Sequence, residues 1–210
     1  MKNNRTDMPQ LMVDQTEKNG KAECMMDYVI SWCLRRADVV CSKEKPILYS
    51  HCRYMLAMLL DQSDYSNLLF RDVKVWKQKQ EIDLWVELKV EEDGLLTKHA
   101  LLIENKYFTG LHDATDVDGV KRNQLVAYKN KFDAHYDIQK DKKGEDWTKH
   151  YALITCLERE SFIKHFGNLA EVDTKPAFKL FSFYELLEND TQTESDLFNE
   201  FWYRWGDASF

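Results

Sequence analysis

Residues 81–106 read EIDLWVELKVEEDGLLTKHALLIENK, and this stretch decides the fold. Apolar and polar residues alternate over 81–91, which is the period of a β-strand. Asp93 and Gly94 are residue types favoured at the centre of a two-residue hairpin turn, and a second strand follows over about 98–106. The stretch therefore predicts an antiparallel hairpin.

The turn also fixes the register of the hairpin, and this register places Asp83 opposite Glu104. It puts Ile82 and Leu84 on one face, and Asp83, Glu104 and Lys106 on the other. Directly opposed Cβ atoms in such a pair are about 4.5–5.5 Å apart. Two carboxylates held so close repel each other, and a divalent cation between them would remove the repulsion.

These residue types suit a magnesium site. Mg²⁺ takes oxygen ligands, so we expect Asp83, Glu104 and the backbone carbonyl of Asn105 to bind it, with Mn²⁺ as a substitute. Lys106 would hold or deprotonate a water beside the metal, or stabilise phosphate charge. The competing interpretation is a solvated hairpin surface with ordinary cross-strand charge pairs.

Hydrophobic periodicity predicts the other elements of an α/β fold. Before the hairpin we expect helices over 22–37 and about 46–62, and a first strand over 70–79. After it we expect a helix over about 120–136, a charged loop over 140–147, a buried strand over 151–157, a short helix over 161–166, an edge strand over 178–183, and helical pieces over 184–187 and 196–205. This order predicts one mixed central sheet flanked by helices. We expect residues 1–20 to form a flexible tail and 21–210 a single domain with a helical C-terminal extension.

The helix after the hairpin carries Gln124 and Tyr128, which lie one turn apart on one face. Together with Asp83 and the strand Ile-Glu-Asn-Lys at 103–106, the run Gln-Leu-Val-Ala-Tyr at 124–128 resembles the PD-(D/E)XK nuclease superfamily. The similarity is to a bacterial branch with an Ile-Glu-Asn-Lys strand and a Gln-Leu-x-x-Tyr helix.

This resemblance implies a restriction-endonuclease-like core, of the order α-β-β-β-α-β, and Mg²⁺-dependent hydrolysis of phosphodiester bonds, usually in DNA. It implies that Asp83 and Glu104 bind the metal and that Lys106 assists the attacking water. Gln124 and Tyr128 would be the helix motif of the catalytic site. An extra acidic residue on the first helix is common in such proteins, and Glu23 is the candidate here.

The chain also departs from the pattern of this family. Ile82 stands where a proline often precedes the aspartate, and Trp76 and Lys77 occupy the strand positions where the branch often has a glutamate. The segment between the hairpin and the helix is long and carries aspartates at 113, 116 and 118. It lacks the residue pattern of a calcium-binding EF-hand, so we expect a flexible acidic loop near the site.

Overall charge restricts how the chain can bind nucleic acid. Lys and Arg number 29 against 36 Asp and Glu, which gives a net charge of −7. Contact with nucleic acid must therefore be local or carried by a metal ion. Six basic residues flank the site in the sequence and are the candidates for phosphate contacts, with a solvated surface as the alternative: Lys74, Lys77, Lys79, Lys121, Arg122 and Lys129.

Composition predicts the setting of the protein. An odd number of cysteines, five, without a CxxC pair indicates no disulfides and no zinc site. The absence of a long apolar run or an apolar leader predicts a cytoplasmic protein without membrane contact. Cleaving both strands of a duplex would need two sites, as in a homodimer. The main hypothesis is a metal-dependent nuclease; the alternatives are a catalytically inactive nuclease-fold protein that binds nucleic acid or protein, and a purely structural domain.

Overall fold

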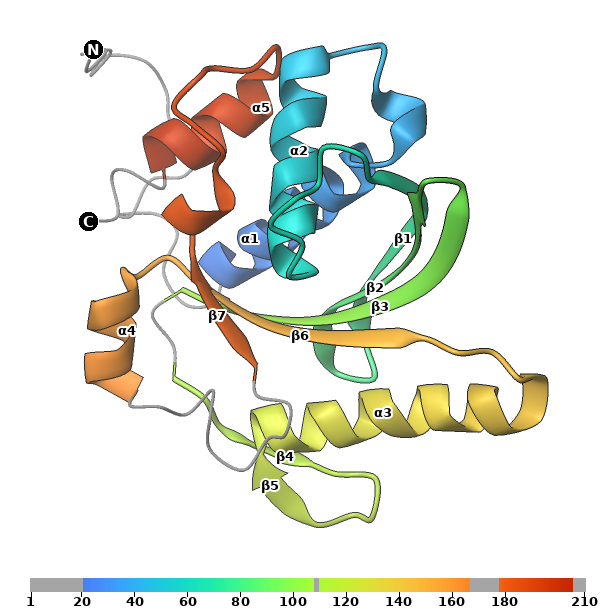
Figure 1. Ribbon diagram of the computed structural model, residues 1–210. Helices are drawn as coiled ribbons and strands as arrows, with labels where there is room; N and C mark the ends of the chain where they lie inside the picture. The colour runs from blue at the N-terminus through green and yellow to red at the C-terminus, as the bar shows by residue number, and fades with distance from the viewer. Residues whose placement is uncertain (1–20, 108–109, 167–177, 206–210) are drawn as a thin grey trace.

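A five-stranded mixed sheet lies at the centre of the molecule (Figure 1). The computed structural model describes residues 21–107, 110–166 and 178–205. The strands of the sheet are β1 (Leu69–Lys79), β2 (Ile82–Glu92), β3 (Leu95–Lys106), β6 (Thr148–Thr155) and β7 (Lys179–Ser182). Their order is β1-β2-β3-β6-β7, in which β1, β2 and β3 are antiparallel neighbours while β6 runs parallel to β3 and to β7. The prediction of an α/β protein with a mixed central sheet is confirmed.

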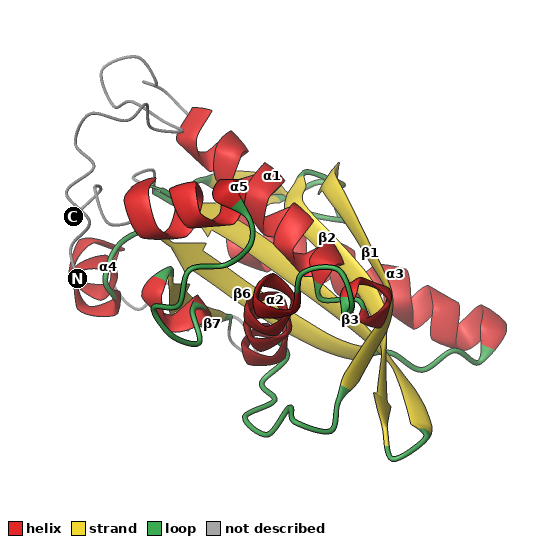
Figure 2. Ribbon diagram, turned by 90° about the horizontal axis from the view of Figure 1, so that it is seen from above, coloured by secondary structure: helices red, strands yellow, loops and turns green. Residues whose placement is uncertain are grey.

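Helices cover both faces of this sheet (Figure 2). One face carries α1 (Lys21–Arg36), α2 (Pro46–Leu59), α5 (Asp196–Asn199) and the helical turns Val39–Cys41, Tyr184–Leu186 and Glu200–Trp205. The other face carries α3 (Gln124–Lys143), and α4 (Arg159–Phe166) lies beside β7. No helix among the described residues is long and apolar enough to cross a membrane. The predicted tail, 1–20, lies outside the described residues.

The β2–β3 hairpin has the predicted register. Its ladder runs from Glu92 opposite Leu95 to Leu84 opposite Ile103. Asp93 and Gly94 form the turn with φ values of 50° and 82°, as a type I′ turn requires. Leu84 and Ile103 pack into the core beneath α1 and α2, whereas Trp85 lies in the core beneath α3.

The regular alternation ends at Gln78 and Asp83, and here one prediction is wrong. Ile82 packs in the core beneath α3 and not on the face of Leu84. Gln78 has a φ of 54°, and neither Gln78 nor Asp83 has a partner in the backbone ladder between β1 and β2. A residue in the left-handed region turns the chain out of the pleat, so the positions beyond it change faces.

The segment before α3 is folded, which corrects the expectation of a flexible acidic loop over 113–118. It forms a small hairpin of β4 (Asp113–Thr115) and β5 (Lys121–Asn123). Arg122 pairs with Asp116 and Asp118, and Asn130 of α3 also donates to Asp116. These bonds, and the burial of Ala114 in the core beneath α3, hold the hairpin together.

The bounds of α3 also differ from the prediction of a helix over 120–136. The helix begins at Gln124 because the side chain of Asn123 accepts a hydrogen bond from the Leu125 N–H, which caps the first turn. It extends to Lys143, so the expected loop over 140–147 is wrong for its first four residues. Lysines in the last turn interact favourably with the negative end of the helix dipole, and Gly144 ends the helix with a φ of 65°.

Candidate active site

Of the predicted pair of carboxylates, Glu104 lies at the end of the central strand β3, inside the protein, whereas Asp83 on β2 is partly exposed. Glu104 has no exposed surface and Lys106 is 5 % exposed. β3 lies between β2 and β6, with Glu104 opposite Leu153 of β6. A solvated hairpin surface is therefore excluded as an interpretation of these residues, since charged side chains are rarely buried without a specific role or partner.

Only one oxygen of the Glu104 carboxylate accepts hydrogen bonds from the described residues. Its Oε1 accepts from the Lys106 ammonium at 2.9 Å and from the side-chain amide of Gln124. Among the described residues, no donor reaches its Oε2. Burial, followed by the nearby Asp83 carboxylate, raises the pKa of Glu104 well above its usual range.

Lys106 remains charged in this environment. Burial disfavours its ammonium form, but the carboxylates of Glu104, Glu23 and Asp83 outweigh that effect and raise the pKa of Lys106. At neutral pH it can donate hydrogen bonds, but it has no free lone pair with which to take a proton.

The backbone ladder between β2 and β3 ends at Leu84, and beyond it the side chain of Asp83 bonds to β3 in place of a backbone partner. Its Oδ2 accepts from the backbone N–H of Asn105 at 2.9 Å, and its Oδ1 accepts from the side-chain amide of Gln78 at 2.9 Å. These bonds hold the carboxylate beside the end of β3. A carboxylate has about four lone-pair positions, so each oxygen can still bind a cation.

Helix α3 supplies the predicted glutamine and tyrosine. Gln124 is the first residue of the helix, and its backbone N–H donates to the carbonyl of His112, which ties β4 to the helix start. Tyr128 follows one turn later and is 5 % exposed. Burial, followed by the charges of Glu104 and Asp83, raises the pKa of Tyr128 to about 12. The structure thus brings together Asp83, Glu104, Lys106, Gln124 and Tyr128.

Helix α1 contributes two acidic residues, only one of which the sequence indicated. Glu23 accepts from the backbone N–H of Tyr107 at 3.0 Å, directly after the β3 strand. Asp27 was missed: its Oδ1 accepts from the side-chain amide of Asn105 at 2.7 Å. Burial and the charge of Asp83 raise the pKa of Asp27 to about 6. The spacing of four residues between Glu23 and Asp27 puts both on one helix face, and this was the available signal.

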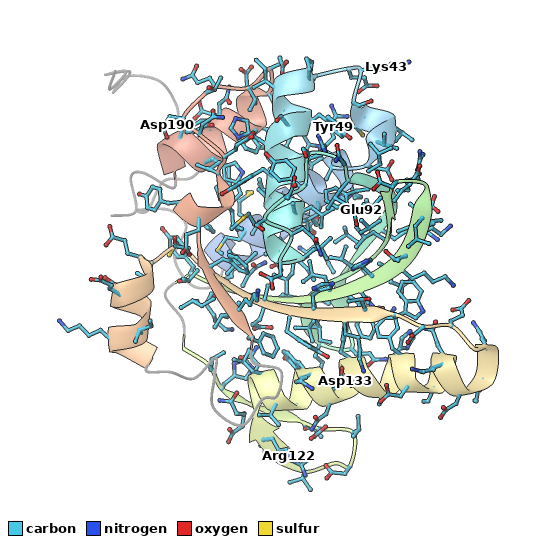
Figure 3. All side chains as sticks on the ribbon, in the orientation of Figure 1. Lys43, Tyr49, Glu92, Arg122, Asp133 and Asp190 are labelled. Atoms are coloured by element: carbon cyan, nitrogen blue, oxygen red, sulfur yellow. The ribbon has the colours of Figure 1, made fainter. Side chains whose placement is uncertain are left out.

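The six basic candidates do not form one surface. Of the six, Lys77 contacts an acidic residue at the site, because its ammonium lies 3.8 Å from the Asp27 carboxylate. Lys129 pairs with Asp133 beside Tyr151 of β6, whereas Arg122 pairs with the acids of the β4–β5 hairpin, on the side of α3 away from the sheet (Figure 3). Lys79 lies against Trp85 and within 3.8 Å of Glu87. Lys74 and Lys121 are exposed.

The donor set fits Mg²⁺ in its chemistry. It consists of the carboxylates of Asp83 and Glu104 and the backbone carbonyl of Asn105, all oxygen ligands as a hard cation requires. The buried Oε2 of Glu104, which no described donor reaches, is an atom that a cation would satisfy. The described residues contain no group of three or more His, Cys, Asp or Glu that could hold a metal. Mg²⁺ needs no such cage, because it keeps several waters and commonly uses one or two carboxylates.

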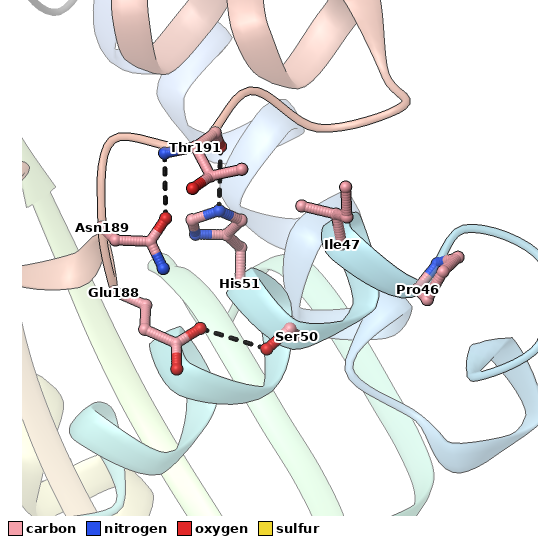
Figure 4. Close-up of a pocket in the computed structure, with 7 residues that line it drawn as sticks. All are labelled: Pro46, Ile47, Ser50, His51, Glu188, Asn189 and Thr191. Carbon is pink, nitrogen blue, oxygen red and sulfur yellow. Dashed lines mark hydrogen bonds between the residues drawn. The ribbon is translucent and has the colours of Figure 1, made fainter.

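A pocket elsewhere in the molecule does not involve these residues (Figure 4). It lies between α2 and the segment before α5, where the ring of His51 is hydrogen-bonded to the Thr191 carbonyl at 3.1 Å and Ser50 donates to Glu188. Tyr65 also donates to Glu188, at 2.6 Å. These bonds fasten the C-terminal segment to α2.

No family model, curated protein or solved structure matches this chain. Its function is therefore inferred from the side chains themselves.

Proposed function

We propose that the protein is a metal-dependent nuclease of the PD-(D/E)XK type, with a restriction-endonuclease-like core, that hydrolyses phosphodiester bonds, most naturally in DNA. The observation that carries this proposal is the environment of Glu104. It is a fully buried carboxylate next to a second one, with a single ammonium on one oxygen and no donor from the described residues on the other. An arrangement that serves stability alone would satisfy both oxygens.

Asp83, Glu104 and the backbone carbonyl of Asn105 would hold Mg²⁺ or Mn²⁺. When bound, the metal supplies a more acidic water and neutralises charge that develops on the phosphate. Lys106, charged at neutral pH, would donate to the attacking water or to a phosphate oxygen and would not take the proton.

The two residues of α3 position these groups. Gln124 donates to the same oxygen of Glu104 as Lys106 does, so it fixes the orientation of the carboxylate. Tyr128 keeps its proton at neutral pH, because its pKa is raised to about 12, and its hydroxyl is available as a donor to the substrate backbone.

The test is a cleavage assay with labelled single-stranded and duplex DNA and RNA, in Mg²⁺, Mn²⁺ or EDTA. We expect metal-dependent cleavage by the wild type and a loss of at least ~100-fold in Glu104→Gln, as removal of a catalytic group in a preorganised site typically causes. Asp118→Asn is the matched control, because it makes the same kind of change at the outer hairpin. Equal rates for wild type and Glu104→Gln would refute the proposal.

A second candidate is a nuclease-fold protein that binds nucleic acid without cutting it. Both oxygens of Asp83 accept donors of the protein itself, which lowers the need for a metal there. Calorimetry distinguishes the two functions: nucleic-acid binding without any binding of Mn²⁺ or Mg²⁺, in the presence of substrate, would favour this candidate.

A further inference from the structure

Two pairs of an aromatic ring and a lysine flank the candidate site at the end of β1. Tyr28 of α1 is 60 % exposed, and the Lys77 ammonium lies 3.3 Å from the centroid of its ring. Trp76 of β1 is 37 % exposed, and the Lys79 ammonium lies 4.6 Å from its ring centroid. Each pair thus combines an exposed aromatic surface with a positive charge.

Both pairs neighbour residues that are bonded to the acidic groups of the site. Gln78 stands between the two lysines in the sequence, and its side chain donates to Asp83 at 2.9 Å. On the other side, Lys77 lies 3.8 Å from Asp27, which is hydrogen-bonded to the Asn105 side chain. The Tyr28 ring is therefore linked to Asp27 through Lys77, and Trp76 lies two residues before Gln78, which is bonded to Asp83.

The two pairs lie on opposite faces of the strand. β1 is an edge strand of the sheet (Figure 2). Lys77 reaches toward α1, whereas Lys79 lies 4.0 Å from the ring centroid of Trp85, which belongs to the core beneath α3. The positive φ of Gln78 causes this, because it breaks the alternation between the two lysines. A polymer that crosses the end of β1 would meet one pair, then Gln78 and Asp83, and then the other pair.

The chemistry of these pairs is that of single-stranded nucleic-acid binding. Proteins of that class combine lysines or arginines that follow the backbone with aromatic rings on which unpaired bases stack. In a continuous duplex the faces of the bases are covered by their neighbours, so a ring can stack only on bases that are unpaired or terminal. Lysines at both rings also offset the repulsion between an acidic site and a phosphate backbone.

Building on the proposed function, we infer that Tyr28 with Lys77 and Trp76 with Lys79 are two stacking positions for unpaired bases on either side of the scissile phosphate. The substrate class is thereby single-stranded nucleic acid or an unpaired flap, and not a continuous duplex.

Binding can be measured without cleavage in a Glu104→Gln background. The probes are a fluorescent single-stranded DNA of mixed sequence and the same sequence as a blunt duplex, followed by anisotropy at fixed low salt. We expect Tyr28→Ala and Trp76→Ala each to weaken single-strand binding by about 5- to 100-fold, the range for loss of one stacked base. Binding of the duplex should be weaker than that of the single strand in the parent protein, and should change less than about twofold in the variants.

Three further variants separate stacking from other effects. Tyr28→Phe and Trp76→Phe keep a ring and should retain most of the binding, whereas Val117→Ala, an exposed change on the β4–β5 hairpin, should retain all of it. Circular dichroism identifies a variant that fails to fold; for such a variant, the comparison of the phenylalanine substitution with the parent decides.

The outcomes distinguish this inference from the proposed function. If wild type cleaves in a Glu104-dependent manner while the alanine variants bind single strands normally, the stacking positions are refuted and the nuclease stands. If the alanine variants lose single-strand affinity but nothing is cleaved, the stacking positions stand and the nuclease is refuted. Equal losses on duplex and single strand would refute the preference for unpaired bases.

Discussion

Two groups of acidic side chains, one in the β4–β5 hairpin and one around Glu104 at the end of β3, have their charges compensated in opposite ways. In the β4–β5 hairpin, Arg122 donates to Asp116 and makes two hydrogen bonds to Asp118. The bonds from Arg122 lower the pKa of Asp118 to about 2. Around Glu104, burial and crowding raise carboxyl pKa values. The first group contributes to folding; the second holds charge that folding alone does not compensate, and this is typical of functional sites.

Replacing the cationic residue of each group should give the largest difference in stability. Lys106→Met removes the ammonium from a buried carboxylate, and we expect a loss of about 3–5 kcal/mol in the free energy of unfolding, as for other buried pairs that lose one partner. Arg122→Met breaks an exposed pair with Asp118, and the buried Asp116 keeps the donors of Asn130 and of the Val117 N–H, so the denaturation midpoint should change less. Urea denaturation of both variants measures the difference, and a larger loss for Arg122→Met would overturn the comparison.

The next largest change in stability is expected at Asp27, and it depends on pH. Its carboxyl group binds a proton more tightly in the folded protein, with a pKa of about 6, than at its ordinary value of 3.8. The stability from this group is therefore fully present below pH 3.8 and is lost as the pH rises through 6. At neutral pH Asp27→Asn should be more stable than wild type by up to about 3 kcal/mol.

Denaturation between pH 4 and 7 tests this expectation. Wild type should lose stability relative to Asp27→Asn as the pH rises through this range. If the difference between the two proteins is independent of pH, the Asp27 carboxylate is not destabilised by its surroundings.

Divalent metal should sharpen the comparison further. A cation that binds only the folded protein stabilises it by about 2.7 kcal/mol at a hundredfold excess over Kd. We expect Mn²⁺ to raise the thermal midpoint of wild type and of Asp118→Asn, relative to EDTA, but not that of Asp83→Asn. A response that survives in Asp83→Asn would locate metal binding away from the carboxylate pair.

The smallest effect is expected at Asp118, with the opposite sign to Asp27. Its pKa of about 2 in the folded protein lies below the ordinary 3.8, so its contribution to stability is present above pH 3.8 and is lost as the pH falls through 2. Asp118→Asn should therefore lose a little stability at neutral pH and converge with wild type in acid. Convergence at neutral pH instead would show that the Arg122 pair is screened by solvent.

Local features of the sequence predicted much of the fold. The Asp93-Gly94 turn fixed the register of β2 and β3, because a tight turn and strand alternation leave one pairing that buries the apolar face. The same register brought Asp83 to the end of β3, next to Glu104. Gln124 and Tyr128 were found by their helical spacing, and both lie beside Glu104.

The features that were missed depend on contacts between distant segments. Gln78 adopts a positive φ without being glycine, and the side-chain bond to Asp83 that accompanies it is not visible in local preferences. The β4–β5 hairpin was missed because it lacks an alternating apolar pattern. Ion pairs with Arg122 hold it instead. Asp27 lies one helical turn after Glu23, but its bond to Asn105 forms only where α1 packs against the end of β3.

The sequence by itself determined the class of the fold, the central hairpin and the residues that could bind a cation, because turn chemistry and side-chain period act over a few residues. Only the tertiary structure decided that Glu104 is fully buried, that Lys106 and Gln124 share one of its oxygens, and that Lys77 and Lys79 of β1 lie over the rings of Tyr28 and Trp76. These properties arise when β6, α1 and α3 exclude water from the end of β3. Burial and electrostatic coupling are set by segments far apart in the chain, so they follow from packing and not from any single stretch of sequence.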